Sequence, residues 1–196
     1  QDPDGRKTGP IGEPIQIWSG LAISPDAAKV AVGVMGQRTQ SPDIWLYDAA
    51  SGVGIPFAAD PALFENAPVW SPDGTRIAFT TGGPVTELAV KPVAGGRATI
   101  LLKSGGAYSL RPNSWSPDGA SVVFERTAPD RNAKSEIWIV SSRGDPAPHR
   151  LIAGDANIFG GRISPDGRWI LYTSDASGRN EVYVQAFPKE GPSYRA

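Results

Sequence analysis

The chain has 196 residues, enough for one substantial hydrophobic core, and its 19 basic and 20 acidic side chains nearly cancel. The basic residues are scattered, which argues against the clustered basic face of a nucleic-acid-binding protein. Cysteine is absent and histidine occurs once, so neither a disulfide framework nor a transition-metal site is expected. No apolar run approaches the ~20 residues of a membrane helix, so we expect no direct membrane insertion by these residues.

Residues 1–10 are polar and rich in Pro and Gly, and we expect a flexible lead-in there. No signal peptide is visible, and because the chain begins with Gln1 we expect it to be a piece of a longer polypeptide. Residues 11–18 (IGEPIQIW) have the pattern of a single strand outside any complete repeat. That strand would belong to a preceding blade or to a closing one.

The motif Ser-Pro-Asp, preceded by Ile or Trp, then occurs four times, and it organises the rest of the chain. Its aspartates are 47, 45 and 48 residues apart, at Asp26, Asp73, Asp118 and Asp166. Repeats at this period indicate a propeller or a solenoid.

Each motif has the chemistry of a tight turn. Pro presets φ, Ser and Asp bond to nearby backbone groups, and the Gly that follows Asp in three copies adopts a positive φ. The first copy has Ala27 in place of this Gly, so its turn must either tolerate a Cβ or be distorted. We interpret the four aspartates as structural turn caps, because they lie in separate repeats, too far apart to act as a catalytic pair.

The residues around each motif predict four antiparallel strands per repeat. One strand ends at the motif, and a second begins four residues after the motif aspartate. Third strands are expected at 44–47, 88–90, 137–140 and 182–185, and fourth strands at 54–58, 98–103 and 149–153. The last repeat shows no convincing fourth strand. No helix of three turns is expected.

Four such repeats predict an all-β fold, a β-propeller of four-stranded antiparallel blades. The blades would span about 18–60, 61–104, 105–154 and 155–190, within a single domain or fragment over residues 11–196. A two-sheet sandwich would explain the strand spacing but not the recurring motif.

At this point the repeats resemble the TolB-type, WD-like propeller repeats, whose hallmark is W-S-P-D-G-x-x-[IV]-[AV]-[FY]. Trp70–Phe79 (WSPDGTRIAF) and Trp115–Phe124 (WSPDGASVVF) carry the hallmark, and Ile163–Pro188 is similar over its full length. The chain looks most like the propeller regions attached to bacterial membrane-anchored serine/threonine kinases. It resembles more loosely the TolB carboxyl-terminal domain and the propellers of prolyl-oligopeptidase-type peptidases.

The resemblance implies a periplasmic or other extracytoplasmic location and a ring of six or more blades. Four repeats leave two interpretations: a part of a larger ring, which we favour, or a chain that closes on itself. In the second, residues 11–18 would pair with residues 182–187 and cover both free sheet edges.

The sequence contains no constellation of catalytic residues. It has no G-x-S-x-G, no phosphate-binding glycine loop and no calcium loop, and we interpret His149, at the start of an outer strand, as a surface residue. No cofactor and no metal are therefore expected. An enzyme working within the propeller itself, such as a sugar lyase or lactonase, is the least favoured class.

An acid also precedes every third strand, at Asp43, Glu87, Glu136 and Glu181. These acids could form a ring that attracts a cation or a basic partner, but we favour solvated strand starts or ion pairs between blades. The motif tryptophan is replaced by Ile23 and Ile163, which indicates a core position that requires apolar bulk.

Recognition is expected on the face opposite the motif turns, where the repeats differ. The loops on that face supply a candidate patch for a protein or peptide partner: Phe64, Glu65, Asn66, Tyr108, Arg111, Asn157 and Phe159. These aromatics could instead pack between blades.

The sequence thus favours a non-catalytic protein-interaction or sensing module of a larger bacterial protein, such as the ectodomain of a kinase. The alternative is the propeller of a prolyl-oligopeptidase-type serine peptidase whose catalytic domain lies elsewhere. The oligomeric state is left open.

Overall fold

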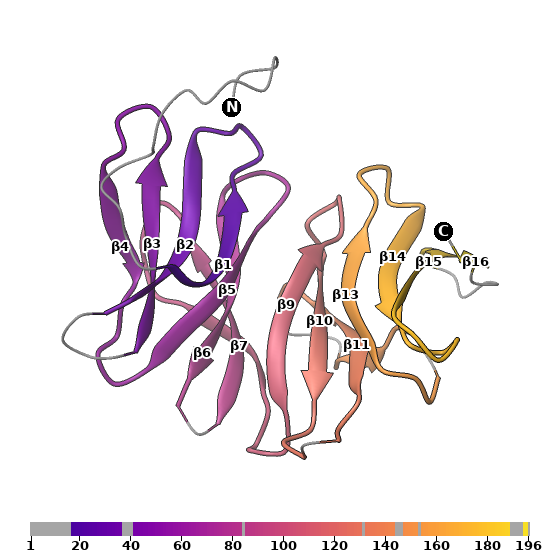
Figure 1. The fold of residues 1–196 in the computed structure, drawn as a ribbon. Helices are drawn as coiled ribbons and strands as arrows, with labels where there is room; N and C mark the ends of the chain where they lie inside the picture. The colour runs from indigo at the N-terminus through magenta and orange to yellow at the C-terminus, as the bar shows by residue number, and fades with distance from the viewer. Residues whose placement is uncertain are drawn as a thin grey trace.

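The structure is a computed structural model that describes residues 17–36, 41–83, 85–130, 132–143, 147–152, 154–188 and 194–195. These ranges contain strands and turns and no helix. The strands form four sheets, each with four antiparallel strands in chain order. Figure 1 shows the sheets succeeding one another from the indigo end of the chain to the yellow end. The predicted all-β propeller is confirmed.

Each sheet is one blade. The first blade contains β1 (Ile17–Ile23), β2 (Lys29–Met35), β3 (Pro42–Asp48) and β4 (Gly54–Ala58). The second contains β5 (Phe64–Trp70), β6 (Arg76–Gly82), β7 (Thr86–Pro92) and β8 (Thr99–Lys103). The third contains β9 (Ser109–Trp115), β10 (Ser121–Thr127), β11 (Ser135–Ser141) and β12 (His149–Arg150). The fourth contains β13 (Ile158–Ile163), β14 (Trp169–Ser174), β15 (Glu181–Ala186) and β16 (Tyr194–Arg195).

The expectation that the last repeat lacks a fourth strand is wrong. Tyr194 and Arg195 form β16, which pairs with Val184 and Tyr183 of β15. This strand could not be predicted from the sequence, because two residues are too few to show an alternation of apolar and polar side chains. Ile17 already belongs to β1, where it pairs with Val34, whereas the lead-in 1–10 and residues 11–16 lie outside the described residues.

The motif turns are built identically in all four blades. The Ser hydroxyl donates to the Asp carboxylate at 2.5–2.6 Å and accepts from the backbone N–H five residues on at 2.9–3.0 Å. The same carboxylate oxygen accepts from the backbone N–H two residues on at 3.0–3.1 Å. Led by the Ser hydroxyl, these bonds lower the pKa of all four aspartates, that of Asp73 and of Asp166 to about 2.

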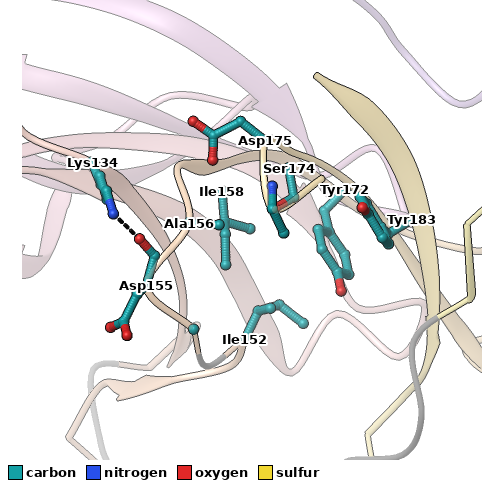
Figure 2. Close-up of a pocket in the computed structure, with 11 residues that line it drawn as sticks. Lys134, Ile152, Asp155, Ala156, Ile158, Tyr172, Ser174, Asp175 and Tyr183 are labelled. Carbon is teal, nitrogen blue, oxygen red and sulfur yellow. Dashed lines mark hydrogen bonds between the residues drawn. The ribbon is translucent and has the colours of Figure 1, made fainter. Parts of the chain in front are cut away.

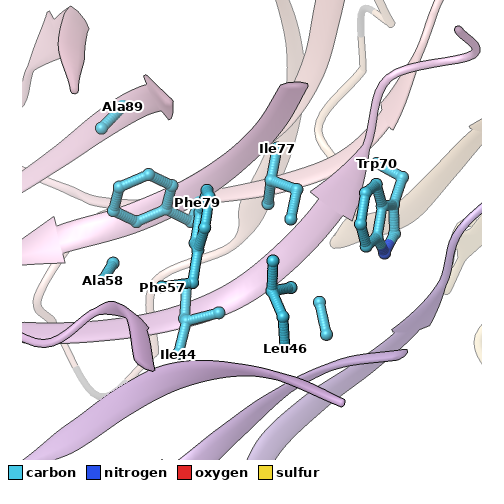
Figure 3. Packing of buried hydrophobic residues seen from close by; sticks show 9 residues of the cluster. Ile44, Leu46, Phe57, Ala58, Trp70, Ile77, Phe79 and Ala89 are labelled. Atoms are coloured by element: carbon cyan, nitrogen blue, oxygen red, sulfur yellow. The ribbon is translucent and has the colours of Figure 1, made fainter. Parts of the chain in front are cut away.

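Apolar side chains fill the three junctions between successive blades. Since neighbouring residues of a strand point to opposite faces, each middle blade supplies two junctions: Ala89 packs toward the first blade and Leu88 toward the third. Figure 3 shows the first junction, where the ring of Phe57 meets that of Phe79 edge-on, with centroids 6.2 Å apart. The hydrophobic core is therefore divided into layers between blades.

The motif tryptophans of the second and third blades link each of these blades to the preceding one. Trp70 and Trp115 are buried, and their indole N–H groups donate to the carbonyls of Ala22 and Val69 at 3.0 and 3.1 Å. The interpretation that the position requires only apolar bulk is therefore incomplete, because the indole also satisfies a carbonyl of the neighbouring inner strand. In the fourth blade, Ile163 has no such group.

Two blade faces carry exposed apolar side chains. On the first blade, Leu21 and Ile23 are each 59% exposed and border a hollow shared with residues of β5, β9 and β13. On the fourth, Trp169, Leu171 and Val182 point away from the third blade and are 40–44% exposed. The two ends of the described arc are thus apolar.

Candidate functional site

A groove opens between the third and fourth blades on the face opposite the motif turns. It encloses about 500 Å³ and is lined by residues of the β10–β11, β12–β13 and β14–β15 loops together with β13, β14 and β15. Figure 2 shows its charged residues Lys134 and Asp155 at one end and its tyrosines at the other. The size suits a small molecule or a few side chains of a peptide.

The inner part of the groove is apolar and aromatic. Ile152 and Ile158 are buried, and the ring of Tyr172 stacks on that of Tyr183 with centroids 5.8 Å apart. Such a surface gains free energy by burying apolar groups of a ligand, and aromatic rings add directional contacts.

The rim of the groove is held by Asn157, one of the predicted patch residues. Its side-chain oxygen accepts from the N–H of Ser135 at 2.8 Å, and its own N–H donates to the carboxylate of Asp175 at 2.8 Å. Lys134 closes the far end by donating to the carbonyl of Asp155. Asn157 thus holds three loops together, and its side-chain oxygen and backbone N–H are both engaged in these contacts.

A second hollow of about 350 Å³ lies on the other side of Lys134 and is lined partly by Tyr108. The guanidinium of Arg126 lies over the ring of Tyr108 at 4.1 Å and over that of Trp138 at 3.7 Å, and it donates to Glu136 at 2.8 Å. Burial alone would raise the pKa of Glu136, but hydrogen bonds from Trp138 and Arg126 outweigh it and lower this pKa. One wall of the hollow is therefore a cluster in which Arg126 is paired with Glu136 and packed on two aromatic rings.

The acids before the third strands are mostly paired within their own blades. Each of three contacts a base on the fourth strand of the same sheet: Glu87 with Lys103 at 3.0 Å, Glu136 with Arg150 at 3.3 Å and Glu181 with Arg195 at 3.2 Å. The favoured interpretation from the sequence is solvated strand starts or ion pairs between blades; these three acids do form ion pairs, but each pair lies within one blade. Asp43 differs, because β4 carries no base and the buried Oδ1 has no partner among the described residues.

The structure distributes the candidate patch over the beginnings of β5, β9 and β13 and the loops that precede them. Tyr108 lines the second hollow and Asn157 holds the groove, whereas Phe159 lies on β13 opposite Thr173. Arg111 is exposed on β9, opposite Glu125. The remaining three residues begin β5, at the junction between the first two blades: Phe64, Glu65 and Asn66.

Most residues of the groove were not predicted as site residues from the sequence. Lys134 and Asp155 stand in loops without a motif, whereas Asp175 and Tyr183 belong to the stretch Ile163–Pro188, whose resemblance to the family repeat predicts only the fold. The expectation that recognition lies opposite the motif turns, where the repeats differ, does point to this face.

Among the described residues, no three His, Cys, Asp or Glu side chains gather where they could hold a metal ion. In the same part of the chain no helix is long and apolar enough to cross a membrane.

Comparison with known proteins identifies the family. The family model of the TolB beta propeller domain matches residues 67–193, more than half of the chain. The chain belongs to the TolB β-propeller family. A solved structure of putative TolB from Agrobacterium tumefaciens has the same fold, with a TM-score of 0.74 at 20% identity, over 90% of this chain and 63% of that one.

Two relatives show that the propeller occurs in larger proteins. The uncharacterized peptidase YuxL of Bacillus subtilis is 26% identical over 82% of this chain. The Tol-Pal system protein TolB of Anaeromyxobacter dehalogenans is 31% identical over 60% of it. The matches span only 31% and 26% of these relatives' own lengths.

Proposed function

We propose that this TolB-type propeller is a non-catalytic module that binds a protein or peptide partner, and that the groove between the third and fourth blades is its binding site. The observation that carries the proposal is the groove itself. It joins a stacked tyrosine pair and two buried isoleucines to a charged rim on the variable-loop face. This combination of an apolar floor and a polar rim is typical of recognition sites.

The rim offers variants that test the site without disturbing the core. Lys134 and Asp155 are exposed, so Lys134→Ala and Asp155→Ala should leave the fold intact. Peptides selected from a displayed library against the chain provide the probe, and their affinities are measured by calorimetry. Each variant should weaken binding at least about fivefold, which corresponds to ~1 kcal/mol.

The matched control is Arg97→Ala, which removes an exposed side chain in the turn between β7 and β8, on the opposite face. It should leave the affinity unchanged. The proposal would be contradicted if no peptide could be selected, or if both groove variants bound the selected peptides with unchanged affinity.

The second candidate function is the propeller of a serine peptidase whose catalytic domain lies elsewhere in the parent protein. It is favoured by the similarity to a relative named as a peptidase over most of this chain. A fluorophosphonate probe, which reacts with activated serines, distinguishes the two functions. Labelling of the full-length parent protein would support the peptidase, and no labelling of folded parent protein would speak against it.

We also propose an extracytoplasmic location for these residues. Support comes from the resemblance to propeller regions of membrane-anchored kinases and from the similarity to a Tol-Pal system protein. Alkaline phosphatase fused to the parent polypeptide directly after this segment should be active, because the enzyme folds only after export. An inactive but stable fusion would contradict this location.

A further inference from the structure

Glu65 occupies a position that belongs to the hydrophobic core in other blades. It lies five residues before Trp70, as Leu110 does before Trp115 and Ile158 before Ile163. Leu110 and Ile158 are 1% and 4% exposed and pack against the preceding blade. Glu65 is also only 4% exposed, so the repeat directs a carboxyl group into the junction between the first two blades.

The surroundings do not satisfy this carboxyl group. Its Oε1 accepts one long bond, 3.4 Å, from the N–H of Asp60 in the β4–β5 loop. Its Oε2 is buried and has no hydrogen-bond partner among the described residues. An unpaired carboxylate in such a place carries a large desolvation cost, which a protonated carboxyl group largely avoids.

Three charged side chains act on Glu65 from the elements around it. Asp43 of β3 and Asp60 of the β4–β5 loop disfavour its ionisation, and Lys91 of β7 favours it. Lys91 is already engaged, because its ammonium donates to the carbonyl of Phe57 and lies 5.0 Å from the centre of the Phe57 ring. Burial is the largest cause and, opposed by the Asp60 N–H bond and aided by the two acids, raises the pKa of Glu65 to about 7.

We propose that Glu65 is a proton-controlled latch that holds the β4–β5 loop, residues 59–63, against the junction of the first two blades. With the carboxyl group protonated, the junction buries no charge and the loop stays packed against it. The Asp60–Glu65 hydrogen bond by itself favours the ionised form, but burial outweighs it. With the group ionised, the carboxylate draws water into the junction and the loop loosens. The latch lies on the same face as the groove but at another junction, so it does not depend on partner binding there.

The direction of the pH dependence follows from proton linkage. In the open state the pKa of Glu65 is that of a free glutamate, about 4.5, and in the closed state it is about 7. The closed state is therefore favoured fully below pH 4.5 and loses its advantage as the pH rises to about 7. Since each pKa unit corresponds to a factor of ten, the closed-to-open ratio should fall by on the order of 300-fold across this window.

Hydrogen exchange of backbone amides tests the latch directly. The amide of Asp60 bonds to Glu65 and that of Leu63 to the Asp60 carbonyl at 3.0 Å, so both report on loop closure. Protection factors, corrected for the intrinsic pH dependence of exchange, are compared at pH 5 and pH 8. We expect protection of residues 59–66 to fall at least about tenfold at the higher pH.

Two variants and an internal reference complete the experiment. Glu65→Gln keeps the shape of the side chain but cannot ionise, and Glu65→Leu introduces the residue found at the equivalent position of the third blade, Leu110. In each variant, the protection of the loop should be the same at both pH values. Residues 104–111, the equivalent segment with Leu110, should show no pH effect in any of the proteins. The proposal would be overturned if the protection of this loop in the unsubstituted chain did not change with pH, or if either variant showed the same pH effect.

Discussion

At the scale of single residues, the backbone of the first motif turn is strained. Ala27 has a φ of +57°, close to the +66° to +69° of Gly74, Gly119 and Gly167. The first turn thus keeps the geometry of the others and tolerates a Cβ, which is one of the two outcomes that the sequence left open. A left-handed conformation costs an L-residue about 1–2 kcal/mol.

Ala27→Gly should therefore stabilise the chain. The relief of strain exceeds the greater entropy of glycine in the unfolded state, and we expect a net gain of roughly 0.5–1 kcal/mol in the free energy of unfolding. Denaturation with urea measures it. The control Ala28→Gly changes an exposed neighbour without a positive φ and should not stabilise the chain. Equal effects of both variants would refute the strain.

At the scale of elements, the blades are joined through their motif tryptophans. Trp115→Phe removes the N–H that bonds to the carbonyl of Val69 and leaves a small cavity in the junction. We expect a loss of about 2 kcal/mol in the free energy of unfolding. Trp169→Phe is the matched control, because Trp169 is 40% exposed on an open face, and it should cost less than about 0.5 kcal/mol. Similar costs for the two would show that the indole bond contributes nothing.

The strands and turns could be predicted from sequence because their determinants are local. Ser-Pro-Asp-Gly specifies its turn within a few residues, and β-branched and aromatic residues follow at constant offsets. The pairing of Glu136 with Arg150 could not be predicted, because it requires the register of strands whose connecting loops vary in length. The groove could not be predicted either, since Lys134 and Tyr183 meet there from two different blades.

At the scale of the whole molecule, the four blades form an arc with two apolar end faces. We propose that further blades of a longer polypeptide cover Leu21 and Ile23 at one end and Trp169 and Leu171 at the other. The inner junctions provide the template, because each buries the equivalent faces of its two blades. Under the proposed function, the binding site lies on the loop face, where the two hollows beside Lys134 are found.

The most direct measurement is the mapping of amide chemical-shift changes in the isotope-labelled chain as a selected peptide is added. Binding at the groove predicts the largest changes in the loops around Lys134, Asp155 and Asp175, with the motif turn at Asp118 unchanged. Changes centred on the motif turns, or on the open faces around Leu21 and Trp169, would contradict the placement of the site.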